Sequence, residues 1–213
     1  MIEHVLPADI EARSFGIIKE ELMERGISLD PVNDPVIRRA IHTTADFEYA
    51  DTLVFTEDSV KLARELIAEG AIIVTDTNMA LTGINKKRAA SYGAEVRCYM
   101  ADEDVAREAK ERGITRASVS MEYAARDIKK SGRKSLFAIG NAPTALITLR
   151  RMHDEGIFTP DFVIGVPVGF VNVVEAKELI IETDIPHIVN RGRKGGSNVA
   201  AAIVNALLYG MDR

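Results

Sequence analysis

Cysteine and clustered metal ligands are what this sequence has least of. Cys98 is its only cysteine, so neither an internal disulfide nor a cysteine-based metal cluster can form. The histidines at positions 4, 42, 153 and 187 are scattered along the chain, whereas zinc and iron sites usually combine several ligands at close spacing. We therefore expect a protein without a metal site and without a bound cofactor.

Long apolar runs and an excess of basic residues are also missing. No stretch approaches the roughly 18 to 20 apolar residues that a membrane-spanning helix needs. The N-terminus lacks the basic start and apolar run of a secretory signal. The formal net charge of −5 argues against a general nucleic-acid binder, which needs a basic surface to neutralise phosphates. These absences predict a cytoplasmic protein that binds neither membranes nor nucleic acids.

Familiar ligand-binding and catalytic loop motifs are absent as well. The glycine-rich segment at 190–198 is not a Walker A loop, which requires Gly-Lys followed by Ser or Thr. Its glycines at 192, 195 and 196 also lack the spacing of the dinucleotide-binding fingerprint. No predicted strand is followed by the Gly-x-Ser-x-Gly of a serine hydrolase. A nucleotide ligand therefore has no motif to support it.

What the chain does contain is the alternating pattern of an α/β protein. Its 213 residues are 46% hydrophobic and 28% charged, which fits one globular domain over residues 1–213. Short apolar runs alternate with amphipathic helical patterns, which predicts a three-layer fold with a mainly parallel sheet of about five strands. The strands are expected at 71–74, 95–99, 135–139, 162–166 and 187–189, with an extra strand at 52–55 left open. The helices are expected at 58–68, 86–92, 102–112, 118–130, 143–155, 173–182 and 197–208.

The first 45 residues differ, because they are typical of two helices, at 8–25 and 35–44, joined by a loop rich in Pro and Asp. Phe15, Ile18 and Leu22 form an apolar stripe on the first helix. Ser14 precedes Ile18 by four residues, so its hydroxyl either bonds back to its own helix or faces a cavity. The sequence pattern favours the first of these arrangements.

The second of these helices carries the strongest catalytic candidate. Arg39 and Arg38 precede His42 by three and four residues, a spacing at which side chains meet on one helix face. A histidine can transfer a proton near neutral pH, and arginines can hold an anion. The pattern predicts catalysis on an acidic substrate, although a lone histidine beside arginines is more often a surface or capping residue. We interpret His153 as a surface residue and His187 as a structural one.

The loops that follow the predicted strands are the expected ligand-binding places. The crevice of an open parallel sheet lies beyond the carboxyl ends of its strands, and the loops here are at 140–144, 165–170 and 190–198. The last loop joins glycines to Arg191, Arg193 and Lys194 just before a helix, so its N–H groups and the helix dipole could hold an anion. The alternative is a glycine-rich turn that packs tightly between strand and helix.

Taken together, these segments resemble the cobalt-precorrin-8 / precorrin-8X methylmutases of cobalamin biosynthesis. The resemblance rests on GNAPTAL at 140–146, VPVGFV at 166–171 with EAK at 175–177, and RGRKGGS at 191–197. EARSF at 11–15 and the segment around His42 also follow the family's order. The resemblance therefore covers nearly the whole chain.

The resemblance implies a flavodoxin-like fold and a homodimer with active sites near the subunit interface. It also implies an isomerase that moves a methyl group from C11 to C12 of a corrinoid ring, without a cofactor, to give a cobyrinate-type product. His42 matches the family's catalytic histidine, which is proposed to protonate or hydrogen-bond a nitrogen of ring C. Ser14 and Arg39 match substrate-contact positions, and Arg116 resembles a further arginine near the ligand.

Asn141 and Arg191, at two of the predicted strand ends, complete the substrate-binding set that we expect. A macrocycle with acetate and propionate arms is strongly anionic, and an acidic protein can bind it only by concentrating arginines at the site. The segment at 42–47 is more similar to the branch of the family that acts on a cobalt-containing ring. Two alternatives remain: a nucleotide or phosphosugar enzyme that uses loop 191–197, and a non-catalytic receiver-like module, which the strand-end residues disfavour.

Overall fold

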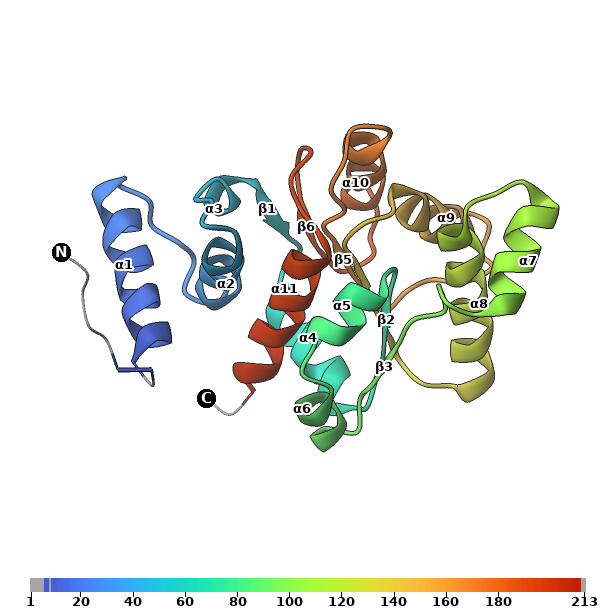
Figure 1. Cartoon of the computed structure of the whole chain (residues 1–213), viewed down its shortest axis with the longest axis horizontal. Coiled ribbons are helices and arrows are strands. Elements are labelled where there is room, and N and C mark those ends of the chain that lie inside the picture. The colour runs from blue at the N-terminus through green and yellow to red at the C-terminus, as the bar shows by residue number, and fades with distance from the viewer. Residues whose placement is uncertain (1–5, 8, 212–213) are drawn as a thin grey trace.

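The protein is an α/β structure built around one mixed sheet. A computed structural model describes residues 6–7 and 9–211. Within this part of the chain, six strands form a sheet in the order β1-β6-β5-β4-β2-β3 (Figure 1). All neighbours run parallel except β1, which pairs antiparallel with β6. The strands are β1 (Leu53–Phe55), β2 (Ile72–Thr75), β3 (Glu95–Arg97), β4 (Ser135–Ile139), β5 (Phe162–Gly165) and β6 (His187–Asn190).

Helices precede the sheet, connect its strands and close the chain. The N-terminal ones are α1 (Ile10–Glu24), α2 (Asp34–Thr44) and α3 (Tyr49–Thr52). The others are α4 (Ser59–Ala68), α5 (Asn78–Gly83), α6 (Lys86–Ser91), α7 (Glu103–Arg112), α8 (Arg116–Ser131), α9 (Pro143–Asp154), α10 (Val173–Ile181) and α11 (Ser197–Tyr209). Among the residues that the structure describes, no helix is long and apolar enough to cross a membrane.

The predicted alternation of strands and helices is confirmed, with every expected element present and its ends within two residues where they are described. The expected count of about five strands is too low, because the chain at 53–55 does form a strand. Its three residues pair with β6 from Leu53 opposite Asn190 to Phe55 opposite Ile188. Such a short edge strand forms through its partner rather than through its own periodicity. The short helices α3 and α5 were not predicted, because four and six residues are too few to show a helical period.

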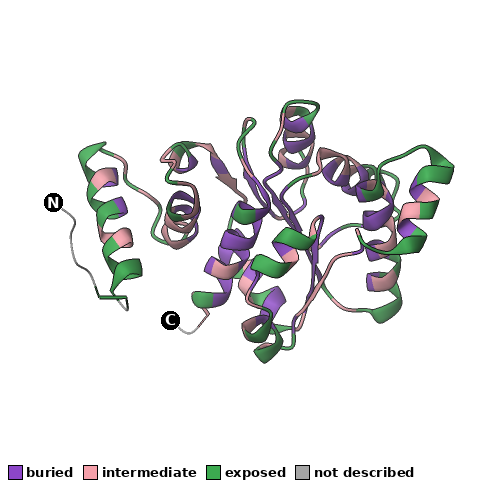
Figure 2. Ribbon diagram, in the orientation of Figure 1, coloured by how far each residue is buried: buried purple, intermediate pink, exposed green. Residues whose placement is uncertain are grey.

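The core has two halves, one on each face of the sheet. Leu136 and Ala138 of β4 pack with α2, α4 and α11, whereas Phe137 and Ile139 pack with α8, α9 and α10. This alternation follows from strand geometry, since successive side chains point to opposite faces. Every residue of β2, β4, β5 and β6 is buried, as expected for parallel strands covered on both sides, and Figure 2 shows this region in purple. The predicted three layers are therefore present.

The N-terminal helices form an extension of one helical layer. Helix α11 packs against α2, and α2 packs against α1, so α1 lies at the end of the molecule, separated from the sheet (Figure 1). Helix α1 is largely green in Figure 2, with Ile18 and Leu22 buried against α2. On its outer side, Ile10 is 53% exposed and Ile17 is 40% exposed.

Candidate active site

Helix α2 positions the candidate acid and one candidate cation. His42 lies in the last turn of α2, Arg39 lies one turn earlier, and the helix ends where Ala45 adopts a left-handed φ of 55°. The exposed imidazole of His42 stacks on Phe15 of α1, with ring centroids 5.0 Å apart and planes inclined by 17°. The Arg39 guanidinium carbon lies 4.7 Å from the centroid of the same Phe15 ring. Phe15 is thus a shared platform, and Arg39 and His42 lie on one helix face as predicted.

The charge of Arg39 is balanced by a weak partner. Its Nη1 donates to Oε1 of Glu11 on α1 at 2.5 Å, and the Glu11 side chain is 59% exposed. An ion pair this exposed contributes only about 0–1 kcal/mol. A ligand carboxylate can therefore replace Glu11 at little cost. Arg38, by contrast, pairs with Asp34 at the start of its own helix.

Ser14 occupies the first of the two arrangements that the sequence left open. Its Oγ donates to the carbonyl oxygen of Ile10, four residues earlier, at 2.9 Å. The side chain is half-buried and directly precedes Phe15 in the chain. The Ser14 oxygen keeps lone pairs with which it can still accept a hydrogen bond.

A cavity of about 500 Å³ lies between α1, α2, α4 and α11. Its lining includes Phe15, Arg38, Arg39, Arg64 and Tyr209. The Arg39 guanidinium contacts two aromatic rings, since its carbon also lies 5.7 Å from the centroid of the Tyr209 ring. Arg39 thus faces this cavity from the platform that it shares with His42. The cavity combines aromatic surface with cations, which suits a large anionic ligand.

A second set of predicted residues lies at the carboxyl end of the sheet. Asn141 is exposed and follows β4 in a loop at 140–142 that is hydrogen-bonded to Asp76, just after β2. The Asp76 carboxylate accepts N–H bonds from Gly140 at 2.9 Å, Asn141 at 2.8 Å and Ala142 at 2.6 Å. Burial raises the pKa of Asp76, and these backbone bonds act against that rise. The buried carboxylate therefore determines the shape of the loop that carries Asn141.

The loop after β6, at residues 191–196 and here called the cationic loop, connects this end of the sheet to the segment that follows α2. Nζ of Lys194 donates to Asp46 at 2.6 Å and to Glu48 at 2.5 Å, and its bond lowers the pKa of Asp46. Asp46 follows His42 by only four residues, so the cationic loop lies beside the end of α2. Arg191, in the same loop, is 54% exposed and pairs with Glu178 of α10 at 3.3 Å.

Arg116 is the first residue of α8 and is exposed. The cap of this helix, Thr115, accepts from the Ser118 N–H at 3.2 Å, and its hydroxyl also bonds that of Thr144 at the start of α9 at 2.8 Å. Arg116 therefore lies at the same end of the molecule as Asn141. Among the described residues, no hydrogen bond or ion pair engages the Arg116 side chain. Its charge remains open to a ligand.

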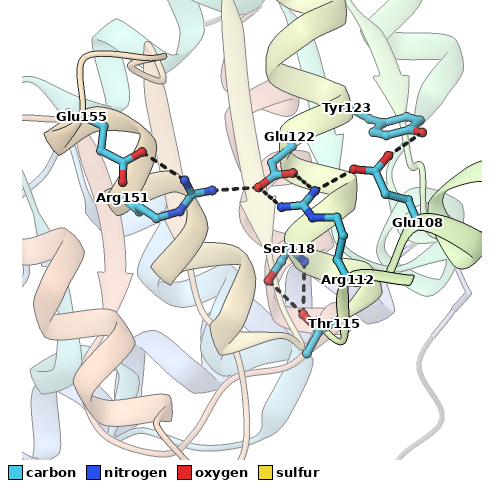
Figure 3. Close-up of polar contacts among 8 residues, drawn as sticks. All are labelled: Glu108, Arg112, Thr115, Ser118, Glu122, Tyr123, Arg151 and Glu155. Carbon is cyan, nitrogen blue, oxygen red and sulfur yellow. Dashed lines mark hydrogen bonds and ion pairs between the residues drawn. The ribbon is translucent and has the colours of Figure 1, made fainter. Parts of the chain in front are cut away.

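A chain of ion pairs fixes the turn that leads into Arg116. Figure 3 shows Arg112, at the end of α7, between Glu108 and Glu122. Glu122 of α8 also pairs with Arg151 of α9, at 2.7 Å. These contacts join α7, α8 and α9 close to Thr115. The position of Arg116 is thus held by a network rather than by the turn alone.

The predicted residues therefore form two groups. His42, Arg39 and Ser14 gather around Phe15, whereas Asn141, Arg191 and Arg116 lie around the carboxyl end of the sheet. The bond from Lys194 to Asp46 connects the two regions. Sequence reasoning missed the role of Phe15, which it assigned to an apolar stripe. Its position next to Ser14 and one turn from Glu11 was the only available signal.

The other histidines have structural surroundings. His187 is buried, its Nδ1 lies 2.8 Å from the Ile185 carbonyl oxygen, and burial lowers its pKa, so the structural interpretation is confirmed. His153 is half-buried and lies 3.3 Å from Asp184 on the surface of the molecule. The histidine at position 4 lies outside the described residues. Within the described ranges, no group of three or more His, Cys, Asp or Glu residues is placed so that it could hold a metal ion.

Comparison with known proteins connects this arrangement to one family. A profile described as precorrin-8X methylmutase matches residues 9–210. A cobalt-precorrin-8 methylmutase from Salmonella typhimurium is 45% identical over 206 residues, which are 95% of each chain. A precorrin-8X methylmutase from Pseudomonas aeruginosa is 35% identical over 97% of this chain and 98% of its own. A solved precorrin-8X methyl mutase from Thermus thermophilus superposes with a TM-score of 0.83 at 37% identity and covers 95% of both chains. The chain belongs to the precorrin-8X methylmutase family.

Proposed function

We propose that this protein moves a methyl group from C11 to C12 of cobalt-precorrin-8 or precorrin-8X to give cobyrinate or hydrogenobyrinate. Membership of the family makes it an isomerase of cobalamin biosynthesis. The observation that carries the proposal is the family match over residues 9–210. That match favours a methylmutase over a nucleotide or phosphosugar enzyme and over a non-catalytic module.

A cobalt-containing ring is the substrate that we favour. The relative from Salmonella typhimurium, 45% identical, is named for cobalt-precorrin-8, whereas the one from Pseudomonas aeruginosa, 35% identical, is named for precorrin-8X. The greater identity supports the cobalt branch. The metal belongs to the substrate, and the protein needs no ligand for it.

His42 acts in this proposal as the general acid. In the reaction the C11–methyl bond breaks and the C12–methyl bond forms, so the product is an isomer of the substrate. A proton held at a nitrogen of ring C favours one arrangement of the double bonds, and a positioned acid typically contributes about 10²- to 10⁴-fold in rate. Stacking on Phe15 covers one face of the imidazole ring, whereas the two ring nitrogens lie at its edge and are not covered by the stacking. No described residue hydrogen-bonds either nitrogen.

The arginines and polar groups hold the acidic arms of the macrocycle. Arg39 releases Glu11 for a carboxylate, Ser14 and Asn141 contribute hydrogen bonds, and Arg191 and Arg116 add charge. Arg116 is informative, because a cation in the first turn of a helix opposes the helix dipole and costs stability. A residue in this unfavourable position is better explained by a ligand than by folding.

The carboxyl end of the sheet is a suitable crevice for such a ligand. Without β1, the parallel strands run in the order β3-β2-β4-β5-β6, which corresponds to the 2-1-3-4-5 order of flavodoxin-like folds. This order supports the flavodoxin-like arrangement that the family resemblance implies. Its switch point lies between β2 and β4, where Asp76 and Asn141 follow their strands. Ligands of such folds bind at that point.

A homodimer is also part of the proposal. Ile10 and Ile17 of α1 are seven residues apart, so they lie on one helix face, and both are exposed. Ser14 lies between them, next to Phe15, so a partner bound here would reach the site. Light scattering should give twice the chain mass for the wild type and a lower mass for Ile17→Asp. A wild-type monomer would reject the dimer.

A cytoplasmic location and the absence of nucleic acid among the partners remain predictions.

The decisive experiment is turnover of the purified protein. Incubation with cobalt-precorrin-8, or with precorrin-8X, should change the absorbance spectrum while the mass of the corrinoid stays the same, as an isomerisation requires. His42→Ala, checked for an unchanged melting temperature, is the control for adventitious conversion. Failure of the folded wild type to convert either ring would reject the proposed function.

A further inference from the structure

Lys177 of α10 is a buried cation without an anion beside it. Its side chain is fully buried, yet among the described residues no carboxylate pairs with it. Burying an ammonium group is costly unless other groups replace its water. The absence of a carboxylate partner means that backbone groups must satisfy this lysine.

Two backbone carbonyls of the cationic loop take that place. Nζ of Lys177 donates to the oxygens of Gly192 and Lys194, each at 2.8 Å. The amide of Asn190, at the end of β6, donates to the oxygens of Arg191 and Lys194 at 3.2 and 2.9 Å. Lys177 and Asn190 thus hold the carbonyl groups of Arg191, Gly192 and Lys194 pointing toward the interior.

Inward carbonyls turn the opposite groups outward. None of the described peptide bonds is cis, and in a trans peptide the C=O of one residue and the N–H of the next point in opposite directions. The N–H groups of Gly192, Arg193 and Gly195 therefore point away from Lys177 and Asn190. No acceptor among the described residues binds these three N–H groups. Arg191 and Arg193, both exposed, project from the same loop.

We infer that Lys177 is a positioning residue, which holds the loop at 191–195 with its N–H groups outward and so makes that loop a receptor for a carboxylate arm of the substrate. This inference rests on the proposed function, since it assigns a task within the same site. Lys177 itself touches no substrate, because its side chain is enclosed.

The protonation of Lys177 makes its positioning role measurable, because ligand binding should then depend on pH. Burial lowers its pKa to about 8, so its charge is lost at mildly alkaline pH, and hydrogen bonds from a charged donor are stronger than those from a neutral one. The charged groups around the loop are Arg191, paired with Glu178, and Lys194, paired with two carboxylates that raise its pKa. Lys194 therefore keeps its charge through the range in which Lys177 loses it.

The test compares Lys177→Met with Lys61→Met, a lysine that is 69% exposed on α4. The probe is the cobyrinate product, titrated by absorbance between pH 6.5 and 9.5, together with KM and kcat. We expect Lys177→Met to weaken product binding about tenfold, which corresponds to about 1.4 kcal/mol, to raise KM in proportion and to change kcat little. Lys61→Met should match the wild type. Binding by the wild type should weaken as the pH rises through about 8, and this dependence should be absent from Lys177→Met.

A corrinoid whose carboxylate arms are replaced by amides distinguishes a loss of loop positioning from general damage to the binding site. Its affinity should fall much less in Lys177→Met than that of cobyrinate does, because neutral amide oxygens accept hydrogen bonds from the outward N–H groups more weakly than carboxylates do. Equal product affinity in both proteins, or an equal loss for the amide form, would overturn the inference. If Lys177→Met fails to fold, wild-type affinity that stays constant from pH 7 to 9.5 would overturn it as well. These outcomes leave turnover by the wild type intact, whereas failure of the proposed function removes it.

Discussion

Replacing Asp76 with asparagine tests how the loop of Asn141 is held. The carboxylate accepts three backbone N–H bonds at 2.6–2.9 Å, from Gly140, Asn141 and Ala142. An asparagine of the same shape offers one acceptor oxygen, and its NH₂ group meets donors instead of acceptors. At least one N–H is therefore left without a partner.

The cost follows from where those N–H groups lie. Gly140 is buried, whereas Ala142 is half-buried and Asn141 is exposed, so water can compensate only part of the loss. Leaving a buried donor unsatisfied costs about 1–3 kcal/mol. The variant also no longer buries a carboxylate, which offsets some of this cost. We expect a net destabilisation of about 1–2 kcal/mol, equivalent to a melting temperature lower by roughly 2–8 °C in a chain of this size.

The assay is urea unfolding of wild type, Asp76→Asn and Asp51→Asn. Asp51 is exposed on α3, so its replacement should change stability by less than about 0.5 kcal/mol. We expect the midpoint of Asp76→Asn to fall with an unchanged slope, as for a loss of stability alone. Its KM should also rise, because the loop of Asn141 is released. An Asp76→Asn protein as stable as Asp51→Asn would refute the reasoning.

Further outcomes follow from the other site residues. His42→Ala should lose about 10²- to 10⁴-fold in kcat while it still binds the corrinoid; normal turnover, measured by absorbance, would remove His42 as the acid. Arg39→Ala should chiefly raise KM, and Glu11→Gln, which frees Arg39, should lower it; unchanged product titrations would show that no carboxylate binds there. Because burial lowers the pKa of His187 from 6.5, its stabilising contribution is present above pH 6.5 and is lost as the pH falls through the lowered value. Stability to urea should therefore fall less between pH 7.5 and 5 in His187→Gln than in the wild type, and equal losses would contradict this.

The sequence by itself determined the order of the elements and the residues at their ends. Strands buried on both faces appear as apolar runs, so β2, β4, β5 and β6 could be located directly. The helical period placed Arg39 and His42 on one face of α2, and the strand-end rule identified the loops of Asn141 and Arg191. These features depend on local backbone geometry, which residues close together in the sequence determine.

Only the tertiary structure decided how distant segments meet. The edge strand β1 forms because its residues pair with β6, as Leu53 does with Asn190. The cationic loop reaches the segment after α2 because Lys194 pairs with Asp46, 148 residues away. An apolar stripe shows that Phe15 is buried on one side, but not that His42 and Arg39 share its ring. The lysine of EAK at 175–177 likewise carries no local sign that it binds carbonyls of the loop after β6. Such contacts depend on packing between elements, which periodicity along one element cannot specify.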